Sequence, residues 1–291
     1  GYVVNRQARS LRTGRSQMIG LLVRDLGTGY VGEIVAGIDA EIAGTDHEML
    51  LFTTHQQARE PEYVATFVGG MADGLLLVLP FKFEAYSELL NQRRFPHVLI
   101  DYEGSSMGPA IGCNNRQGAY DGASYLLSLG HRRIGFITGI LTMGSSRSRL
   151  LGYRQALSDH GLAVDPALVV EGDYLQPAGY VGAHALLALP EPPTAVFASN
   201  DVMAFGAMEA IREAGLRIPH DISVLGFDDI PQSAGVAPAL TTVRQPLHEM
   251  GRQAVQMLLS YIKDPDRPFE YRELSTNLAI RSSCVPAHGA S

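Results

Sequence analysis

Residues 194–227, TAVFASNDVMAFGAMEAIREAGLRIPHDISVLGF, predict a strand, a helix and a second strand in direct succession. The run at 194–199 is short and apolar, and the following stretch repeats small and apolar residues at helical spacing. Gly215 is typical of a helix end, and 221–227 is apolar again. Because both strands lack polar alternation, we expect them in a parallel sheet that helices cover on both faces.

The same alternation extends in both directions along the chain. Expected strands are 18–23, 48–54, 74–80, 97–101, 133–139, 168–170, 241–243 and short segments near 271–281. Expected helices are about 31–42, 60–71, 82–93, 114–129, 145–160, 178–188 and a last one from Pro246. The second half repeats the pattern of the first. The fold class is therefore α/β, with two lobes, each a parallel sheet flanked by helices, and ligands expected at the carboxyl ends of the strands.

Composition excludes several classes of protein. The 291 residues are 46% hydrophobic and 18% charged, as in a globular protein with ample core-forming material. No apolar run approaches the roughly 18 residues that span a bilayer, and no export signal is recognisable, so we expect a cytoplasmic protein without a membrane partner. Two distant cysteines, Cys113 and Cys284, favour reduced thiols over a metal site or a disulfide framework.

Charge is distributed unevenly. Lysine and arginine number 23 against 30 acids, a formal charge of −7, which disfavours general nucleic-acid binding. Residues 1–16 nevertheless contain four arginines and no acid, so 17–291 hold 19 basic residues against 30 acids, or −11. In this arm Arg9 and Arg12 suit phosphate contacts and Leu11 suits a wedge between base steps. The alternative is a disordered basic tail.

Enzyme motifs are weak or absent. Residues 27–32 spell G-x-G-x-x-G, but the second strand ends in Thr53-Thr54 rather than in an acid that could hold a ribose hydroxyl. We interpret the motif as a flexible loop between a strand and a helix. No phosphate-binding P-loop, H-E-x-x-H or G-x-S-x-G sequence occurs. The sequence therefore predicts no enzymatic activity, no cofactor and no metal ligands.

Polar residues that follow strands are the candidate binding groups. The pair Asp228-Asp229 could accept hydrogen bonds from a polyol, bind a metal or cap a turn. One residue of Asn200-Asp201 is expected to cap the next helix. The start of the helix at 145–149 suits an anion or a sugar, and a solvated first turn is the equal alternative.

Several segments together resemble the lactose/galactose repressor (LacI/GalR) family of bacterial transcription regulators. They are ARSLRTGRS (8–16), GHRRIGFITG (130–139), RSRLLGYRQAL (147–157), FASNDVMAFGAMEAIREAGLRIPHDISVLGFDDI (197–230) and PALTTVRQPLHEMGRQAV (238–255). The resemblance covers the chain in order and implies a core like a type I periplasmic binding protein. It implies that 1–16 is a remnant of the headpiece and hinge helix, with most of the helix-turn-helix headpiece lacking. It places 17–128 with 245–273 in the first lobe and 129–244 with 274–291 in the second.

The resemblance also implies residue roles. The effector-binding positions that carry over are Tyr30, Val31, Arg149, Tyr174, Phe197, Asn200 and Asp228. Arg149 matches the family's effector-binding arginine, Asp228 the acid that accepts ligand hydroxyls, and Leu11 the hinge residue that enters the minor groove. Some members have an acid where this chain has Cys113, so that side of the pocket is expected to be less polar.

The expected function is that of a ligand-responsive transcriptional repressor. A sugar or sugar derivative would bind in the cleft between the lobes and control operator binding allosterically. Two copies would form a homodimer on a two-fold operator, or pair further into a tetramer. The alternative is a periplasmic-type sugar- or solute-binding protein, which the basic arm argues against.

Overall fold

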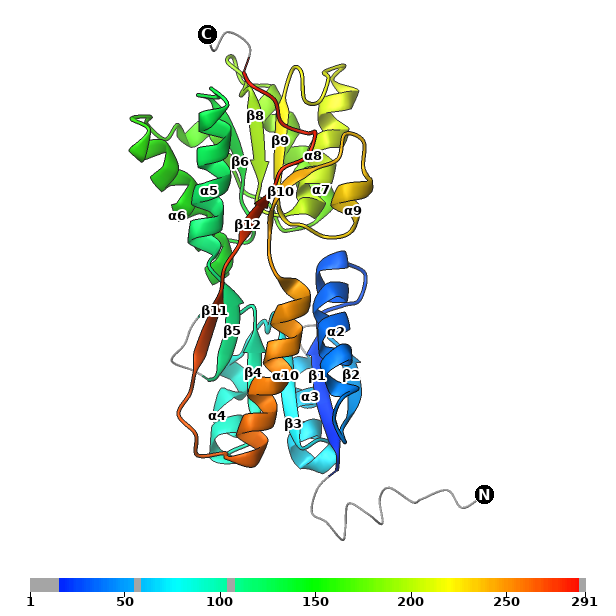
Figure 1. Cartoon of the computed structure of the whole chain (residues 1–291). Helices are drawn as coiled ribbons and strands as arrows, with labels where there is room; N and C mark the ends of the chain where they lie inside the picture. The colour runs from blue at the N-terminus through cyan, green and yellow to red at the C-terminus, as the bar shows by residue number, and fades with distance from the viewer. Residues whose placement is uncertain (1–15, 55–58, 104–107, 288–291) are drawn as a thin grey trace. The chain divides into compact units, whose positions relative to one another are not determined.

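The structure is a computed structural model that describes residues 16–54, 59–103 and 108–287. The chain forms two compact units. The first contains the residues up to Gly112 and Pro246–Leu274, and the second contains Cys113–Gln245 and the residues from Ser275. The chain therefore passes between the units three times, and each unit is built from separate stretches of sequence (Figure 1).

A six-stranded sheet forms the centre of the first unit, in the order β11-β5-β4-β3-β1-β2. The strands are β1 (Met18–Val23), β2 (Glu48–Thr53), β3 (Gly74–Val78), β4 (His97–Ile100), β5 (Ala110–Cys113) and β11 (Tyr271–Leu274). The pairs from β2 through β1, β3 and β4 to β5 are all parallel. β3 and β4 are buried at every position, as the continuous apolar runs predicted.

Helices cover this sheet. They are α2 (Gly29–Ile42), α3 (Glu60–Thr66), the π-helical turn η2 (Phe67–Met71), α4 (Glu84–Gln92) and α10 (Leu247–Lys263). Figure 1 shows α2 and α10 side by side, although more than two hundred residues separate them in sequence. α10 buries a stripe of apolar residues that includes Met250, Ala254 and Leu258, the face predicted from the sequence.

The second unit has a sheet in the order β12-β10-β9-β8-β6-β7. Its strands are β6 (Ile134–Ile137), β7 (Val169–Val170), β8 (Ala195–Ala198), β9 (Ser223–Asp228), β10 (Thr241–Arg244) and β12 (Asn277–Ala279). The pairs from β7 to β10 are parallel, and β12 runs antiparallel to β10 at the edge. Two parallel sheets, one in each unit, confirm the predicted fold class.

The helices of the second unit pack in pairs. They are α5 (Asn115–Ser128), α6 (Gly144–Asp159), the 3-10 turn η3 (Pro166–Leu168), α7 (Gln176–Leu187), α8 (Asp201–Glu213) and α9 (Gln232–Gly235). α5 packs on α6, and α7 packs on α8 (Figure 1). A Cβ atom at Gly152 of α6 would lie 2.1 Å from the carbonyl oxygen of Arg116 in α5, so the absence of a side chain there allows the two backbones to approach.

The structure corrects the lobe boundary and adds a strand. The first lobe expected from the sequence ends at residue 128, whereas residues 113–128 belong to the second unit because α5 packs against α6. β5 has only four residues and is not among the expected strands. Within the part of the chain that the structure describes, no helix is long and apolar enough to cross a membrane.

Candidate functional site

Parallel pairing of β6, β8, β9 and β10 brings the carboxyl ends of four strands to one edge of the second unit's sheet. Polar residues follow these ends directly. Ser199 and Asn200 follow β8, Asp228 ends β9, and Gln245 follows β10. Each of these four residues is buried, so the edge holds a cluster of polar groups that water does not reach. Such a cluster persists only where its groups satisfy one another or a ligand.

Arg149 on α6 lies in this cluster and is 3% exposed. Its Nε donates to Oδ1 of Asn115 at 2.8 Å, and its Nη1 donates to the carbonyl oxygen of Ser199 at 2.5 Å. The same Nη1 lies 3.5 Å from Oδ1 of Asp228, and the guanidinium carbon lies 3.8 Å above the ring of Phe227. These four contacts fix the orientation of the planar guanidinium, which suits directional hydrogen bonding.

Asp228 is equally constrained. Its backbone φ is +119°, outside the regions that residues with a side chain usually adopt. Nε2 of Gln245 donates to its Oδ1 at 2.7 Å, and the backbone nitrogen of Gln245 donates to its carbonyl oxygen at 3.1 Å. The structure thus brings Arg149 and Asp228 together as predicted, and it adds Gln245, which the sequence analysis missed.

Asp229 takes a different role from its neighbour. Its carboxylate pairs with Arg244 of β10 at 2.5 Å and with Arg281 after β12 at 2.6 Å. The two neighbouring acids therefore have different surroundings. Asp228 faces Arg149, whereas Asp229 holds the turn against the edge of the sheet. Among the described residues no group of three or more histidines, cysteines or acids could hold a metal ion.

Asn200 caps α8, as the sequence analysis expected of one member of the pair. Its Oδ1 accepts from the backbone nitrogen of Met203 at 2.9 Å, and its Nδ2 donates to the carbonyl oxygen of Tyr174 at 3.1 Å. Tyr174 follows β7 with φ +73°, and its ring packs over Gly139. Asn200 therefore positions Tyr174. A contact of either residue with an effector stays a prediction.

Phe197 does not lie at this edge. It is in the middle of β8, fully buried, with its ring 5.2 Å from that of Phe136 in an edge-to-face contact. Its side chain packs in the core of the second unit, and its part in effector binding stays a prediction. Phe227, one residue before Asp228, is the aromatic residue that contacts the site arginine.

The remaining predicted residues lie in the first unit or outside the described residues. Tyr30 and Val31 are buried in the first turn of α2, after the carboxyl end of β1, where the hydroxyl of Thr28 accepts from the nitrogen of Val31 at 3.4 Å. Their part in effector binding stays a prediction. Arg9, Leu11 and Arg12 lie outside the residues that the structure describes.

The sequence did not predict Asn115 or Gln245 as residues near the site. Asp201 was considered only as a possible helix cap, and Asn200 takes that role. Asn115, Gln245 and Asp201 each come within two residues of a strand's carboxyl end or begin the helix that follows one. The rule that pointed to Asp228 applies to these positions as well. Cys113 ends β5 and is buried, in keeping with a reduced thiol.

The amino-acid sequence is similar to known transcriptional repressors. A family model described as a periplasmic binding protein-like domain matches residues 123–284. The HTH-type transcriptional repressor CytR of Escherichia coli (strain K12) is 34% identical over 289 residues, which are 97% of this chain and 84% of that protein. The ribose operon repressor of Haemophilus influenzae is also 34% identical, over 97% of this chain and 85% of that protein.

Solved structures show the same likeness. A LacI family transcriptional regulator from Enterococcus faecium with bound ribose superposes with a TM-score of 0.83 at 26% identity, covering 93% of this chain and 99% of that one. The transcriptional regulator CelR in complex with cellobiose gives a TM-score of 0.85 at 26% identity, covering 95% of this chain and 89% of that one.

Proposed function

The chain belongs to the LacI/GalR family of transcription regulators, and from this premise we propose that Arg149 and Asp228 bind the effector of a ligand-responsive repressor. The observation that carries the proposal is the contact itself: a cation and an acid 3.5 Å apart, both almost fully buried, at the carboxyl edge of a parallel sheet. The relatives named above are repressors, and none of them is a periplasmic solute-binding protein.

We infer that the effector is a sugar or a sugar derivative. A hydroxyl group both donates and accepts hydrogen bonds, so neighbouring hydroxyls on one ring match an arginine beside a carboxylate. Phe227 covers one face of the guanidinium and fixes its orientation beside the carboxylate of Asp228. Ribose and cellobiose in the two structural neighbours are ligands of this chemistry.

The proposal extends to operator DNA. We propose that residues 1–16 contact the operator, with Arg9 and Arg12 binding phosphates and Leu11 entering the minor groove. A cytoplasmic homodimer would bring two such segments to a two-fold operator. Effector binding in the core would control the DNA-binding segments by favouring one of two arrangements of the dimer.

A thermal-shift screen tests the effector site. Wild-type protein is screened against monosaccharides, disaccharides, nucleosides and nucleobases, since a ligand that binds only the folded state raises the melting temperature. The best compound is then titrated by calorimetry into Arg149→Gln and Asp228→Asn. Each substitution removes a charge but keeps the approximate shape, and we expect affinity to fall at least ten-fold.

Arg154→Ala is the matched control, because Arg154 lies on the same helix with an exposed side chain. It should bind as the wild type does. If Arg149→Gln and Asp228→Asn also keep wild-type affinity for that compound, the effector does not bind at this pair.

A further inference from the structure

Asp201 is a completely buried carboxylate at the first residue of α8. Three donors from other elements converge on it. The backbone nitrogen of Ile230 and the hydroxyl of Ser233 donate to Oδ2, at 2.9 and 2.6 Å, and the hydroxyl of Thr242 donates to Oδ1 at 2.5 Å. One side chain thus ties α8 to the turn after β9, to α9 and to β10.

The turn that Asp201 holds carries the site acid. Asp228 and Asp229 have φ values of +119° and +60°, and consecutive residues in such conformations persist only when the surroundings fix them. Ile230 follows these two residues directly, and its backbone nitrogen donates a hydrogen bond to Asp201. On the other side, a Cβ atom at Gly226 would lie 2.2 Å from Oδ1 of Asp201, so the strand passes directly against the carboxylate.

β10 links the same carboxylate to the site from the opposite direction. Thr242, which donates to Asp201, pairs in register with Gly226. Three residues further along, Gln245 donates to the carboxylate of Asp228. Both segments that position Asp228 are therefore bonded to Asp201.

We propose that Asp201 is a positioning residue that fixes the strained turn at Asp228–Ile230 and thereby directs the carboxylate of Asp228 toward Arg149. The functional part of this inference rests on the proposed role of that pair, whereas the geometric part does not depend on any effector.

The charge of Asp201 supports a positioning role over simple space-filling. Burial, together with the nearby charge of Asp229, raises the pKa of Asp201 to about 7, although the three hydrogen bonds that it accepts act to lower it. The charged groups facing this region are Asp229 and its partners Arg244 and Arg281. An asparagine would fill the same space without the cost of a buried charge, but its amide nitrogen cannot accept a hydrogen bond. Only a carboxylate has two oxygens that can accept hydrogen bonds, one from the turn and one from Thr242 of β10.

Hydrogen exchange of the complete chain, without effector, tests the proposal. In Asp201→Asn we expect the amide of Ile230 to exchange at least ten-fold faster than in the wild type, after normalisation to global stability measured in urea. Asp165→Asn is the matched control, since Asp165 likewise accepts a backbone bond, from Ala167, at a distant turn of the same unit. The control should leave Ile230 unchanged.

A pH series separates positioning from a general loss of structure. In the wild type, protection of Ile230 should increase as the pH is lowered from 8 to 6, once intrinsic exchange rates are divided out. The closed turn, in which burial raises the pKa of Asp201, binds a proton more tightly than an opened turn in which the carboxyl group is solvated. The Asp201→Asn profile should be flat. Parallel profiles, or exchange at Ile230 that changes only in proportion to global stability, would overturn the proposal.

Thr242→Val guards against a variant that fails to fold. It removes one donor and keeps the shape of the side chain, and we expect a smaller increase in exchange at Ile230, about three-fold. An unchanged rate would also count against the proposal. Arg149→Gln should show wild-type exchange at Ile230, so failure of the effector site and failure of this inference give different results.

Discussion

Gln245 illustrates how much one side chain contributes to the site. It is buried, its Nε2 donates to Asp228, and its Oε1 has no hydrogen-bond partner among the described residues. Gln245→Met keeps the length of the side chain and removes the donor. We expect the free energy of unfolding, measured in urea, to fall by about 1–3 kcal/mol, because an oxygen of the buried carboxylate loses a hydrogen bond.

The control for this prediction is Gln155→Met. Gln155 is exposed on α6 and donates to Asp159, so its replacement should change stability by less than about 0.5 kcal/mol. Equal losses of unfolding free energy in the two variants would mean that the hydrogen bond from Gln245 to Asp228 stabilises the fold no more than an exposed one does.

At the residue scale, the sequence predicted what local rules determine. The family motifs point to Arg149 near the start of a helix, and to Asp228 where a motif coincides with the end of a strand. Phe197 lies inside β8 rather than beyond its carboxyl end, so its predicted part in effector binding rests on the family resemblance alone. Asn115 was missed because its contact with Arg149 joins two helices, and no local pattern reports which side chains meet across a helix pair.

Close helix packing gives a prediction at the element scale. Gly152→Ala places a methyl group where only 2.1 Å separates it from the carbonyl oxygen of Arg116, so α5 and α6 must move apart. Overpacking of this kind typically costs about 1–3 kcal/mol, and we expect at least that loss in urea unfolding.

Gly32→Ala is the opposite case. Gly32 lies within α2, and no heavy atom lies within 4 Å of a Cβ built there. Alanine should stabilise the helix by about 0.5–1 kcal/mol through its higher propensity. Destabilisation by both substitutions would contradict the packing argument.

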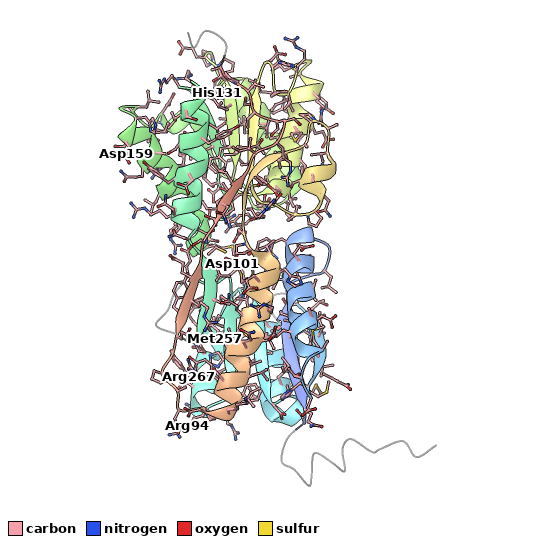
Figure 2. All side chains as sticks on the ribbon, viewed as in Figure 1. Arg94, Asp101, His131, Asp159, Met257 and Arg267 are labelled. Atoms are coloured by element: carbon pink, nitrogen blue, oxygen red, sulfur yellow. The ribbon has the colours of Figure 1, made fainter. Side chains whose placement is uncertain are left out.

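His131 gives a pH prediction for the elements that it joins (labelled in Figure 2). Its Nε2 donates to the carbonyl oxygen of Val285 at 3.0 Å, and its Nδ1 accepts from the hydroxyl of Thr194 at 2.9 Å, which ties the C-terminal segment to the start of β8. Burial lowers the pKa of His131 below its usual 6.5.

A lowered pKa in the folded state means that the unfolded chain binds the proton more readily. The neutral ring therefore stabilises the fold fully above pH 6.5, and this contribution decreases as the pH falls below that value. We expect the stability difference between wild type and His131→Asn, from urea unfolding at pH 8, 7, 6 and 5, to shrink at the two lower values. His220→Asn, at an exposed position, is the control substitution.

The sequence predicts helices and strands well where apolar runs are long. It predicts them poorly where tertiary contacts determine the bounds of an element or the unit to which it belongs. The expected strand 18–23 matches β1, and the expected helix 60–71 divides into α3 and η2 at a point that no periodicity marks. The assignment of α5 to a unit depended on its packing against α6, which is information that spacing alone does not contain.

At the scale of the whole molecule, charge and topology separate two tasks. Each unit carries a parallel sheet with its own carboxyl edge, and the second unit alone contains the buried pair of Arg149 and Asp228. The acidic residues belong to 17–291, whereas 1–16 carries four arginines and no acid. A body with a formal charge of −11 disfavours phosphate binding, so we expect the DNA affinity of this chain to come from the basic segment.

This division predicts how the chain binds DNA. Four arginines displace at most four counterions, so the logarithm of the binding constant should fall with the logarithm of salt concentration at a slope of about −4 for one chain and about −7 for a dimer. Fluorescence anisotropy with a 30-base-pair duplex of arbitrary sequence, between 50 and 200 mM KCl, measures the slope. Replacing Arg6, Arg9, Arg12 and Arg15 with alanine should abolish binding while leaving the thermal response to an effector intact. Binding that survives this replacement would place a DNA contact on the acidic body and contradict the division of tasks.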